Sequence, residues 1–429
     1  MGIEKQYDEI ARCNRCGFCQ VACPIFRSTG HEAGVARGRI ALLRALIEGR
    51  LEWDRELEEP LFACLLCGAC TSNCFPAVPT ADLILDARCE YLDRVGRSRL
   101  HKLLFEHLLP YPGRLRLAAR AAALGKRTGL SKVARALGLL RIFGRDFPRA
   151  QEIVEHFPDR AFREKVKPGV VEGRGGPRIG YFIGCGTDIM CPQVAEATLG
   201  VLRQVGRTVC VLDNCCCGLP AACYGDRTAA VRLAEKNLQL FAEGRFELIV
   251  TDCSSCAAFL KKYPTLFAED DPRHAAAEAF AAAVRDFPEL IASAQKLSPP
   301  PQPTEQIIAT YHDPCHASRG QRLVDQPRQI LRSIPGLEYR ELPEADWCCG
   351  GAGSYALSHY ELSRQVLDRK IDNVERTGAN LLVTSCPACI IHLSYGVRQR
   401  GLPLRVCHIA ELVSDRRAGR SPTALAAGQ

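Results

Sequence analysis

The second half of the chain alternates between short apolar runs and stretches with helical periodicity. After a run comes a pattern such as 229–244 (AAVRLAEKNLQLFAEG) or 360–378 (YELSRQVLDRKIDNVERTG), in which apolar residues recur every three or four positions. The runs are 179–183, 209–213, 248–251, 308–311, 337–342 and 381–384. This alternation predicts parallel sheets with helices on both faces, a fold that gathers ligands at the carboxyl ends of its strands.

The first half of the chain has helical patterns instead. Residues 40–49 (IALLRALIEG) predict one helix, and residues 97–149, rich in Leu, Ala and Arg, predict short amphipathic helices interrupted at Pro110, Pro112 and Gly125. Two Gly- or Pro-rich segments predict linkers, one before the strand-containing region and one dividing it. They are 167–178 (KPGVVEGRGGPR) and 296–306 (KLSPPPQPTEQ).

Two cysteine quartets near the N-terminus share the spacing C-x2-C-x2-C-x3-C. They are Cys13, Cys16, Cys19 and Cys23, and Cys64, Cys67, Cys70 and Cys74. In two-cluster ferredoxins, three thiolates of such a run bind one cubane cluster and the fourth binds the other. We therefore expect two [4Fe–4S] clusters, the first on Cys13, Cys16, Cys19 and Cys74 and the second on Cys64, Cys67, Cys70 and Cys23. Structural zinc is the weaker interpretation, because zinc sites seldom use eight thiolates at this spacing.

Ten further cysteines form an internal repeat. Copy one has Cys185, Cys216-Cys217-Gly218 and Cys253-x-x-Cys256; copy two has Cys315, Cys348-Cys349-Gly350 and Cys386-x-x-Cys389. Equivalent cysteines are offset by 130, 132 and 133 residues, and LIVTDCSSC at 248–256 matches LLVTSCPAC at 381–389. Each cluster follows a predicted strand, so we expect two metal sites at strand ends, where the glycines give backbone freedom or close approach.

These features predict an α+β protein of several domains, in keeping with a length of 429 residues. We expect a helical two-cluster ferredoxin-like domain followed by a tandem repeat of α/β cysteine-rich domains. The boundaries are 1–95 for the ferredoxin-like domain, 96–177 for a basic helical connector, 178–297 and 306–413 for the cysteine-rich domains, and 414–429 for a flexible tail.

Cysteine content and the N-terminal sequence indicate the compartment. With 24 cysteines in a long chain, and with polar and charged residues over Met1–Glu9, we expect no secretory leader. The thiols should then be metal-bound in a reducing cytoplasm rather than paired as disulfides. No apolar run approaches the ~18 residues needed to span a bilayer. We therefore expect a soluble protein, or one peripheral on a membrane.

Charge is concentrated in the connector. The net charge is +8, and residues 97–149 carry 13 Lys or Arg against 2 acidic residues. This stretch is either a solvated connector or a docking face for an acidic partner or an anionic lipid surface. Aromatic residues are sparse and no reader motif occurs in the sequence, so nucleic-acid binding is not expected.

Two histidines and six cysteines lie outside these ligand sets. His312 and His316 flank Cys315. They either hydrogen-bond cluster sulfur or donate protons there, or their rings are satisfied at a strand end. We expect the extra cysteines to be small buried side chains, with Cys215 the one close enough to join a ligand set. They are Cys89, Cys191, Cys210, Cys215, Cys223 and Cys407. The sequence holds no complete G-x-G-x-x-G and no P-loop, so no flavin or nicotinamide site is evident and no catalytic residue is assigned.

The pattern Cys…Cys-Cys-Gly…Cys-x-x-Cys resembles the CCG domain of heterodisulfide reductases and related proteins. That resemblance implies one or two further iron–sulfur clusters in the repeats, in some members a non-cubane type on five cysteines, with zinc in one repeat as the alternative. From Cys13 to about Leu412, the chain resembles the iron–sulfur subunit of glycolate oxidase and its lactate-oxidising relatives. The matching segments are CGFCQVACP at 16–24, GVARGRIALL at 34–43, CLLCGACTSNC at 64–74, CCGGAGSYALSH at 348–359 and LSRQVLDRK at 362–370.

The resemblance implies an electron-transfer subunit that is not catalytic alone. A separate FAD-binding subunit would oxidise a 2-hydroxy acid, glycolate or lactate, and electrons would pass through this chain towards a quinone or another membrane carrier. The chain would then be cytoplasmic or peripheral on the inner face of the cell membrane. One departure favours another class: Cys386 and Cys389 are both present, as in the catalytic subunit of heterodisulfide reductase, which reduces a disulfide at a CCG-bound cluster.

Overall fold

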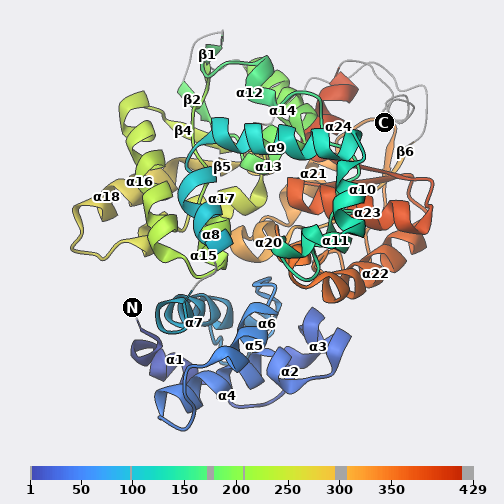
Figure 1. The fold of residues 1–429 in the computed structure, drawn as a ribbon. Helices are drawn as coiled ribbons and strands as arrows, with labels where there is room; N and C mark the ends of the chain where they lie inside the picture. Colours follow the sequence, from blue (N-terminus) through green and yellow to red (C-terminus); the bar gives the residue numbers. More distant parts are fainter. Residues whose placement is uncertain (1, 97–98, 172–177, 206–207, 295–306, 418–429) are drawn as a thin grey trace.

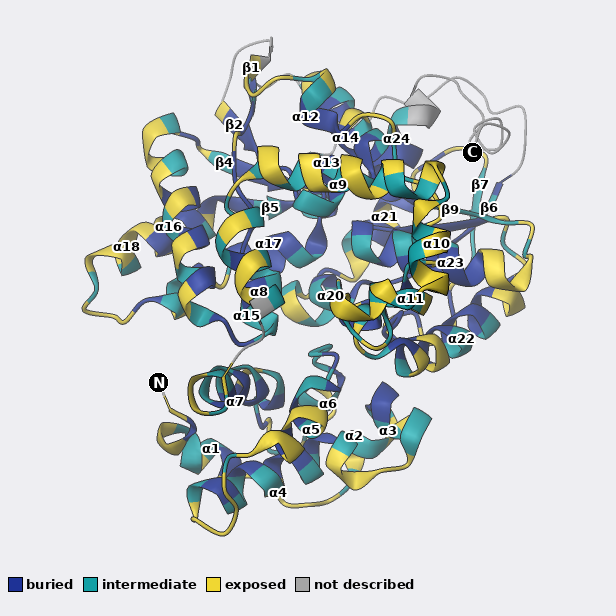
Figure 2. Ribbon diagram, viewed as in Figure 1, coloured by how far each residue is buried: buried dark blue, intermediate teal, exposed yellow. Residues whose placement is uncertain are grey.

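In the computed structural model, a helical N-terminal unit lies below two α/β units, and the helices of the connector run across the front of both (Figure 1). The structure describes residues 2–96, 99–171, 178–205, 208–294 and 307–417. The strands and the helices beside them are mostly buried, whereas the connector helices show exposed residues on their outer side (Figure 2). The connector therefore packs onto a core that the α/β units already provide.

The N-terminal unit is built from short helices whose apolar residues meet in one core. Ile10, Leu43, Leu61 and Ile84 are buried there. A helix was predicted at 40–49, and α4 occupies this place. The helices are η1 (Ile3–Gln6), α1 (Tyr7–Ala11), α2 (Phe18–Ala22), α3 (Pro24–Thr29), η2 (Glu32–Gly34), α4 (Ala36–Ile47), η3 (Arg55–Leu57), α5 (Glu58–Phe62), α6 (Ala69–Ser72) and α7 (Thr80–Arg94). Most of the quartet cysteines lie in the loops between them, whereas Cys19 lies in α2 and Cys70 in α6.

The connector is helical, as predicted, and it breaks at Pro110 and Pro112 but not at Gly125. Pro112 begins α9, a position that suits proline because the first helical N–H needs no partner. Gly125 does not interrupt α9, because a glycine in a helix costs only about 1 kcal/mol; the turn comes instead at Gly129, whose φ is 75°. The elements are α8 (Arg99–Leu103), the π-helical η4 (Leu104–Leu108), α9 (Pro112–Arg127), α10 (Leu130–Ala136), η5 (Leu139–Phe143), α11 (Phe147–Ala150) and α12 (Phe162–Lys165).

The first α/β unit contains the three strands predicted for it and two more. Its sheet has the order β1-β3-β2-β4-β5, parallel except that β1 pairs antiparallel with β3. The prediction of a linker at 167–178 is wrong at 169–171, which form β1. The elements are β1 (Gly169–Val171), β2 (Arg178–Tyr181), α13 (Cys185–Met190), α14 (Pro192–Gln204), β3 (Thr208–Val211), α15 (Leu219–Cys223), α16 (Arg227–Gly244), β4 (Leu248–Thr251), α17 (Ser254–Leu260), η6 (Tyr263–Leu266), α18 (Pro272–Ala283), β5 (Val284–Asp286) and α19 (Phe287–Ser293).

The second α/β unit repeats this topology. Its parallel sheet has the order β7-β6-β8-β9, which corresponds to β3-β2-β4-β5 of the first. Helix α24 reaches Arg417, so the predicted tail begins too early, because 414–417 are helical. The elements are β6 (Ile307–Tyr311), α20 (Cys315–Gln321), α21 (Asp325–Arg332), β7 (Leu337–Tyr339), η7 (Tyr355–Leu357), α22 (Tyr360–Arg376), β8 (Leu381–Thr384), α23 (Pro387–Arg400), β9 (Arg405–His408) and α24 (Ile409–Arg417). The linker 296–306, residues 172–177 and the tail after Arg417 lie outside the described residues.

Alternating strand residues pack on opposite faces of the first sheet. Ile179 and Tyr181 of β2 belong to a core with Leu199 of α14, whereas Ile249 of β4 packs with Leu233 of α16. Helices therefore cover both faces, as the sequence pattern predicts. The cysteine motifs follow β2, β3 and β4 and, in the second unit, β6, β7 and β8, so all ten repeat cysteines lie beyond the carboxyl ends of strands.

Candidate metal centres

The two N-terminal quartets lie on loops of the same conformation. Arg15 and Gly17 have φ values of 54° and 90°, and the corresponding Leu66 and Gly68 have 53° and 73°. These left-handed residues turn the chain tightly between the cysteines. A short helix, α2 or α6, then begins and carries the third cysteine of the run. The identical spacing of the two quartets thus reflects an identical backbone path.

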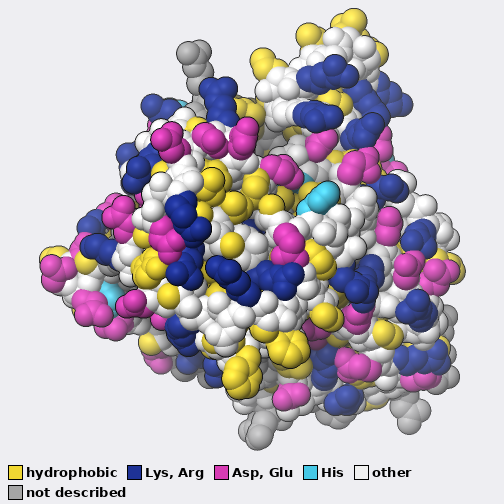
Figure 3. All heavy atoms as spheres, turned by 90° about the horizontal axis from the view of Figure 1, so that it is seen from below, with side chains coloured by type: hydrophobic (Ala, Val, Ile, Leu, Met, Phe, Trp, Pro, Cys, Tyr) yellow, Lys and Arg dark blue, Asp and Glu magenta, His cyan; other side chains and the backbone are white. Residues whose placement is uncertain are grey.

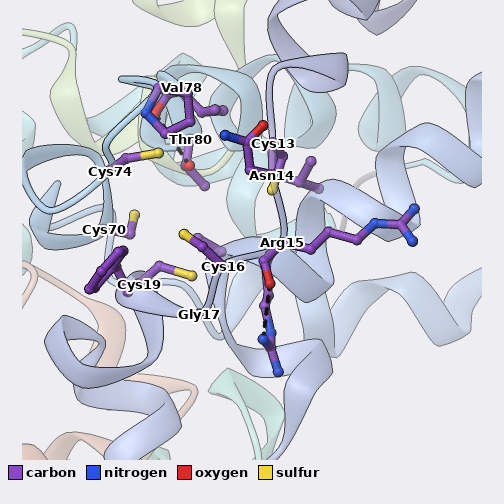
Figure 4. A pocket seen from close by; sticks show the side chains of 15 residues that line it. Cys13, Asn14, Arg15, Cys16, Gly17, Cys19, Cys70, Cys74, Val78 and Thr80 are labelled. Atoms are coloured by element: carbon purple, nitrogen blue, oxygen red, sulfur yellow. Dashed lines mark hydrogen bonds between the residues drawn. The ribbon is translucent and has the colours of Figure 1, made fainter.

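Cysteines from both quartets meet in one pocket of the N-terminal unit. Cys13, Cys16 and Cys19 line it together with Cys74 and Cys70. Their sulfur atoms converge on a shared space (Figure 4). The spacing predicted that Cys74 joins the first three thiols, and the structure brings these four together, with Cys70 beside them.

The remaining cysteines of the quartets form a second group. Cys23 and Cys70 each interact with Cys64. Burial is the main cause that raises the pKa of Cys70 to about 12, and the nearby Cys64 thiol is the next. The pKa of the Cys67 thiol is raised well above its ordinary value, mainly by burial and next by the nearby Cys348 of the second repeat. Buried thiols of this kind become thiolates when a metal compensates their charge. The group suits a cationic centre that faces the second repeat.

The five cysteines of the first repeat are linked thiol to thiol. Cys185 Sγ lies 3.9 Å from Cys216 Sγ. Cys217 hydrogen-bonds to the thiols of Cys216 and Cys256, and Cys253 hydrogen-bonds to Cys256. Strand ends distant in sequence thus bring all five predicted ligands to one place.

The second repeat shows the same order of contacts. Cys348 hydrogen-bonds to the thiols of Cys315 and Cys349. Cys349 in turn contacts Cys389, and Cys386 contacts Cys389. The second site is therefore a structural copy of the first in its sulfur donors.

The two sites touch each other through Cys253 and Cys386, whose thiols hydrogen-bond across the junction of the repeats. Ser255 Oγ of the first repeat lies 3.3 Å from Cys386 Sγ, and His316 Nδ1 lies 2.9 Å from that hydroxyl. Ten thiols consequently form one continuous series through both α/β units. Sequence spacing alone groups the cysteines by repeat and does not reveal this junction.

Arg319 connects the N-terminal unit with the second site. Its Nη1 donates to the Cys67 carbonyl at 3.4 Å, and its Nη2 pairs with Asp346 at 2.7 Å. The guanidinium also interacts electrostatically with the thiols of Cys67, Cys315 and Cys348. Arg319 thus lies where the second cysteine group of the N-terminal unit meets the second repeat.

The glycines after the cysteine pairs are required by geometry, as predicted. Gly218 and Gly350 have φ values of 97° and 84°. A Cβ on Gly350 would lie 2.5 Å from the carbonyl oxygen of Ser363. The backbone N–H groups of Gly218 and Gly350 donate to Cys216 Sγ and Cys348 Sγ at 3.5 and 3.4 Å. Each glycine therefore allows a tight turn whose amide faces a ligand sulfur.

The two histidines that flank Cys315 differ in their surroundings. His316 has Ser255 as a partner. His312 is 0% exposed, and its ring nitrogens make no well-formed hydrogen bond within the described residues beyond an interaction with the backbone of Ala345. One of its ring nitrogens and the Sγ atoms of Cys349 and Cys389 all lie within 4.8 Å of one another. Burial lowers the pKa of His312 to about 3, so the ring is neutral.

Cys215 does not join the first site. Its Sγ donates to the carbonyl of Leu233 at 3.5 Å and to Asn237 Oδ1 at 3.4 Å, both on α16. Cys191 and Cys407 pack in apolar clusters. These three extra cysteines are buried, as expected for small apolar side chains.

Lys370 is a functional candidate that the sequence analysis missed. It is 0% exposed, and its ammonium donates to the carbonyls of Glu344 and Ala345. Burial lowers its pKa to about 8, while Cys349 acts in the opposite direction. Its burial could have been predicted from the sequence, because Lys370 continues the buried stripe of α22 that includes Ser363 and Val366.

The donor sets suit iron–sulfur clusters. The cysteines of the N-terminal unit approach in two groups, and thiolate sulfur is the usual ligand of such clusters. The repeats add two buried groups of five thiols each. Backbone amides and the Lys370 ammonium offset part of the negative charge that these thiolates would carry.

Comparison with protein families agrees with the motifs. The family described as "4Fe-4S dicluster domain" matches residues 9–77, and "Cysteine-rich domain" (CCG) matches residues 179–261 and 309–394. The family described as "Glycolate oxidase iron-sulfur subunit, linker region" matches residues 96–154. A "Probable glycolate oxidase iron-sulfur subunit" of Bacillus subtilis (strain 168) is 31% identical over 95% of this chain and 94% of its own length. The chain belongs to the glycolate oxidase iron–sulfur subunit family.

Other relatives of this family member have related names. "Lactate utilization protein A" of Geobacillus kaustophilus is 30% identical over 56% of the chain and 99% of its own length. A component of "Fumarate reductase (CoM/CoB)" from Methanothermobacter marburgensis is 28% identical over 94% of the chain and 71% of its own length. Iron–sulfur binding and an oxidoreductase role follow from the family, and the α+β fold with its tandem CCG repeat is as predicted. Within the described ranges, no helix has both the length and the apolar composition needed to cross a membrane.

Proposed function

We propose that this chain is the electron-transfer subunit of a flavin-dependent 2-hydroxy-acid dehydrogenase. A separate FAD subunit would oxidise glycolate or lactate, and this chain would carry the electrons towards a quinone or another membrane carrier. The observation that supports this role is the continuous series of thiols, from the pocket of Cys13 through Cys67 to the second repeat and from there to Cys185. A catalytic site for a single substrate would not need so many redox-competent ligand groups in sequence.

The cysteines divide into four proposed ligand sets. The first [4Fe–4S] cluster would be held by Cys13, Cys16, Cys19 and Cys74 and the second by Cys23, Cys64, Cys67 and Cys70, because these thiols lie together. Further metal would be held in the repeats by Cys185, Cys216, Cys217, Cys253 and Cys256, and by Cys315, Cys348, Cys349, Cys386 and Cys389. The clusters supply one-electron transfer; the chain's own residues hold them, exclude water and compensate charge. Iron in both repeats is the proposal, and zinc in one is the alternative that metal analysis decides.

The first cysteine group reaches the surface of the molecule, where the FAD subunit could approach it. Cys16 is exposed, and Phe18, which lines the same pocket, is 62% exposed. Phe75 follows Cys74 and is 90% exposed. Hydrophobic side chains lie at the surface between Lys and Arg on the face seen from below, which the N-terminal unit forms (Figure 3). We infer that the FAD subunit docks here, since exposed aromatic residues commonly anchor protein interfaces.

Reconstitution with the partner tests the division of labour. Anaerobically purified chain alone should give no substrate-dependent reduction of a redox dye with glycolate or lactate. Addition of the FAD subunit should start dye reduction, and quinone reduction should require both proteins. Dye reduction by the isolated chain with either hydroxy acid would refute the proposal.

A second candidate function is reduction of a disulfide at one of the repeats. The complete pair Cys386 and Cys389 favours it, and both thiols contact their neighbours in the second site. The relative named for a CoM/CoB-linked fumarate reductase also aligns over most of the chain. Incubating the reduced chain with disulfide substrates and measuring free thiols would distinguish this function from simple electron transfer.

A further inference from the structure

His312 stands out among the buried polar groups of the α/β units. A buried hydrogen-bond donor or acceptor without a partner is destabilising, so nearly all find one. His312 is completely buried, and its ring nitrogens make no well-formed hydrogen bond within the described residues beyond an interaction with the backbone of Ala345. Its ring instead lies in the group with Cys349 and Cys389 whose ligand atoms are within 4.8 Å of one another. One imidazole nitrogen and two thiols grouped at this distance in a fully buried place indicate a missing partner common to all three.

The first repeat has an apolar residue at the equivalent place. Phe182 precedes Cys185 by three residues, as His312 precedes Cys315. The backbone N–H of Phe182 donates to the carbonyl of Val250 at 2.8 Å, and that of His312 donates to Val383 at 2.9 Å. Phe182 therefore occupies in the first repeat the position that His312 occupies in the second. The imidazole is an addition to the second site.

A second difference points the same way. Lys370 and Asn237 occupy equivalent positions on α22 and α16, 133 residues apart. Asn237 Nδ2 donates to the Cys216 carbonyl at 3.1 Å and to the Tyr263 hydroxyl at 3.0 Å, so the first site has an ordinary neutral network. The second site has a buried ammonium instead. The two repeats thus share their cysteines but differ in the groups around them.

We propose that His312 is a metal ligand of the second repeat, bound through a ring nitrogen beside the thiolates of Cys349 and Cys389, whereas the first repeat binds its metal through sulfur alone. This rests on the proposed function only in that the second repeat holds metal.

The experiment is pulsed EPR and X-ray absorption on the full anaerobically purified chain, with histidine labelled by ¹⁵N. Absorption at the iron and zinc edges identifies which metal has nitrogen in its coordination shell. If it is iron, the reduced protein should show the strong nitrogen coupling of a bound imidazole, and ¹⁵N labelling should change it. His312→Phe, which installs the residue of the first repeat, should abolish the nitrogen signal. His392→Gln should keep it, because the His392 ring already has Ser363 as a partner at 3.0 Å.

A reciprocal variant keeps the test decisive if His312→Phe loses its metal. Phe182→His places an imidazole at the equivalent position in the first repeat and should add a second nitrogen-ligated centre. The proposal is overturned if metal-filled wild-type protein has sulfur ligation only at both edges, or if the nitrogen signal persists in His312→Phe. Either result would leave the proposed electron-transfer function intact, since partner-dependent dye reduction is measured separately.

Discussion

Ser254 and Ser385 join the two cysteine-rich units at their centre. The backbone N–H of Ser254 donates to the Ser385 carbonyl at 3.1 Å, and the two hydroxyls lie 2.8 Å apart. The surrounding helices pack in pairs across the two units. Helix α13 contacts α23, and their equivalents α20 and α17 contact each other in the same way. Likewise, α14 contacts α24, and their equivalents α21 and α19 contact each other. Each contact between the two units therefore occurs twice with the roles of the units exchanged, as expected for a pseudo-twofold axis. The axis brings Cys253 and Cys386 together.

Removing the Ser385 hydroxyl should weaken this junction. Ser385→Ala leaves the hydroxyls of Ser254 and Tyr311, both 2.8 Å from Ser385 Oγ, without this buried partner. We expect a loss of about 1–3 kcal/mol in the free energy of unfolding and a changed magnetic interaction between the centres of the repeats. Thermal unfolding and EPR of anaerobic protein measure these effects. The control is Ser293→Ala, at an exposed helix end, which should behave as wild type.

Cysteine substitutions test the N-terminal ligand sets. Cys19→Ser should remove one cubane and destabilise the N-terminal unit, because Cys19 faces the shared pocket with Cys74. Cys89→Ser should leave iron content and the EPR spectrum unchanged, since Cys89 lies on α7 outside that pocket. Two cubanes account for about eight irons, so wild-type protein should exceed eight when the repeats are filled. Equal damage from both substitutions, or an iron count that stops at eight with zinc present, would contradict these assignments.

The strands could be predicted from the sequence where a local pattern of apolar residues marks them. Six strands could be predicted because each apolar run is short and is followed by a helical pattern. Strand β5 (Val284–Asp286) was missed because its three residues continue the alanine-rich pattern of α18, and only pairing with β4 makes them extended. β9 (Arg405–His408) lacks a continuous apolar run and is likewise fixed by pairing with β8.

The candidate sites were predictable within each motif but not between motifs. Spacing indicated which cysteines would group, because three thiols of each quartet share one loop and the thiols of each repeat follow neighbouring strand ends. The contact of Cys67 with Cys348 and the junction of Cys253 with Cys386 depend on how whole units pack. The difference between His312 and His316 was equally hidden, because it depends on whether Ser255 of the other repeat is within reach.

Arg319 should tune the centres on either side of it. Its side chain is 12% exposed and interacts with the thiols of Cys67, Cys315 and Cys348. Reduction adds negative charge, which a nearby buried cation stabilises. We therefore expect Arg319→Gln to lower the reduction potentials of the adjacent centres and to slow partner-dependent turnover. Redox titration followed by EPR measures the shift. Arg322→Gln, at an exposed position of the same segment, is the matched control, and equal potentials in Arg319→Gln and wild type would refute this role.

The exposed aromatic residues beside the first cysteine group should bind the FAD subunit. Phe18→Ser with Phe75→Ser removes the two anchors without touching a cysteine. Truncating an interface anchor costs more than 1 kcal/mol, so partner affinity should fall about tenfold or more. Calorimetry of the anaerobic proteins measures it, with iron content checked in parallel. Val170→Ser, which removes an exposed apolar side chain from β1 instead, should leave affinity unchanged. Unchanged binding by the double variant would place the partner elsewhere.

The basic connector is either a solvated connector or a docking face for an acidic partner or an anionic lipid surface, and the structure shows which of its charges already have partners. Arg116 pairs with Asp188 at 3.3 Å and Arg120 with Glu164 at 2.9 Å, while the Arg114 guanidinium lies 4.2 Å from the centre of the Tyr111 ring. These cations already have partners within the chain. Reversing them would disturb packing as well as charge.

Lys132, Arg141 and Arg145 are the better test of this surface. They are exposed, and no ion pair involves them within the described ranges. The neighbouring Leu139 and Ile142 are 61% and 80% exposed, so basic and apolar groups lie together, as on surfaces that bind lipid headgroups.

Reversing Lys132, Arg141 and Arg145 to Glu should weaken co-sedimentation with anionic vesicles and leave iron content unchanged. Wild-type binding should itself fall as salt rises, because exposed charges are screened beyond about 8 Å at physiological ionic strength. Neutral vesicles serve as the control for the apolar contribution. If the triple variant sediments with anionic vesicles as wild type does at every salt concentration, the stretch serves as a solvated connector. Its charge would then act mainly through the internal pairs of Arg116 and Arg120, which fasten it to the first α/β unit and to α12.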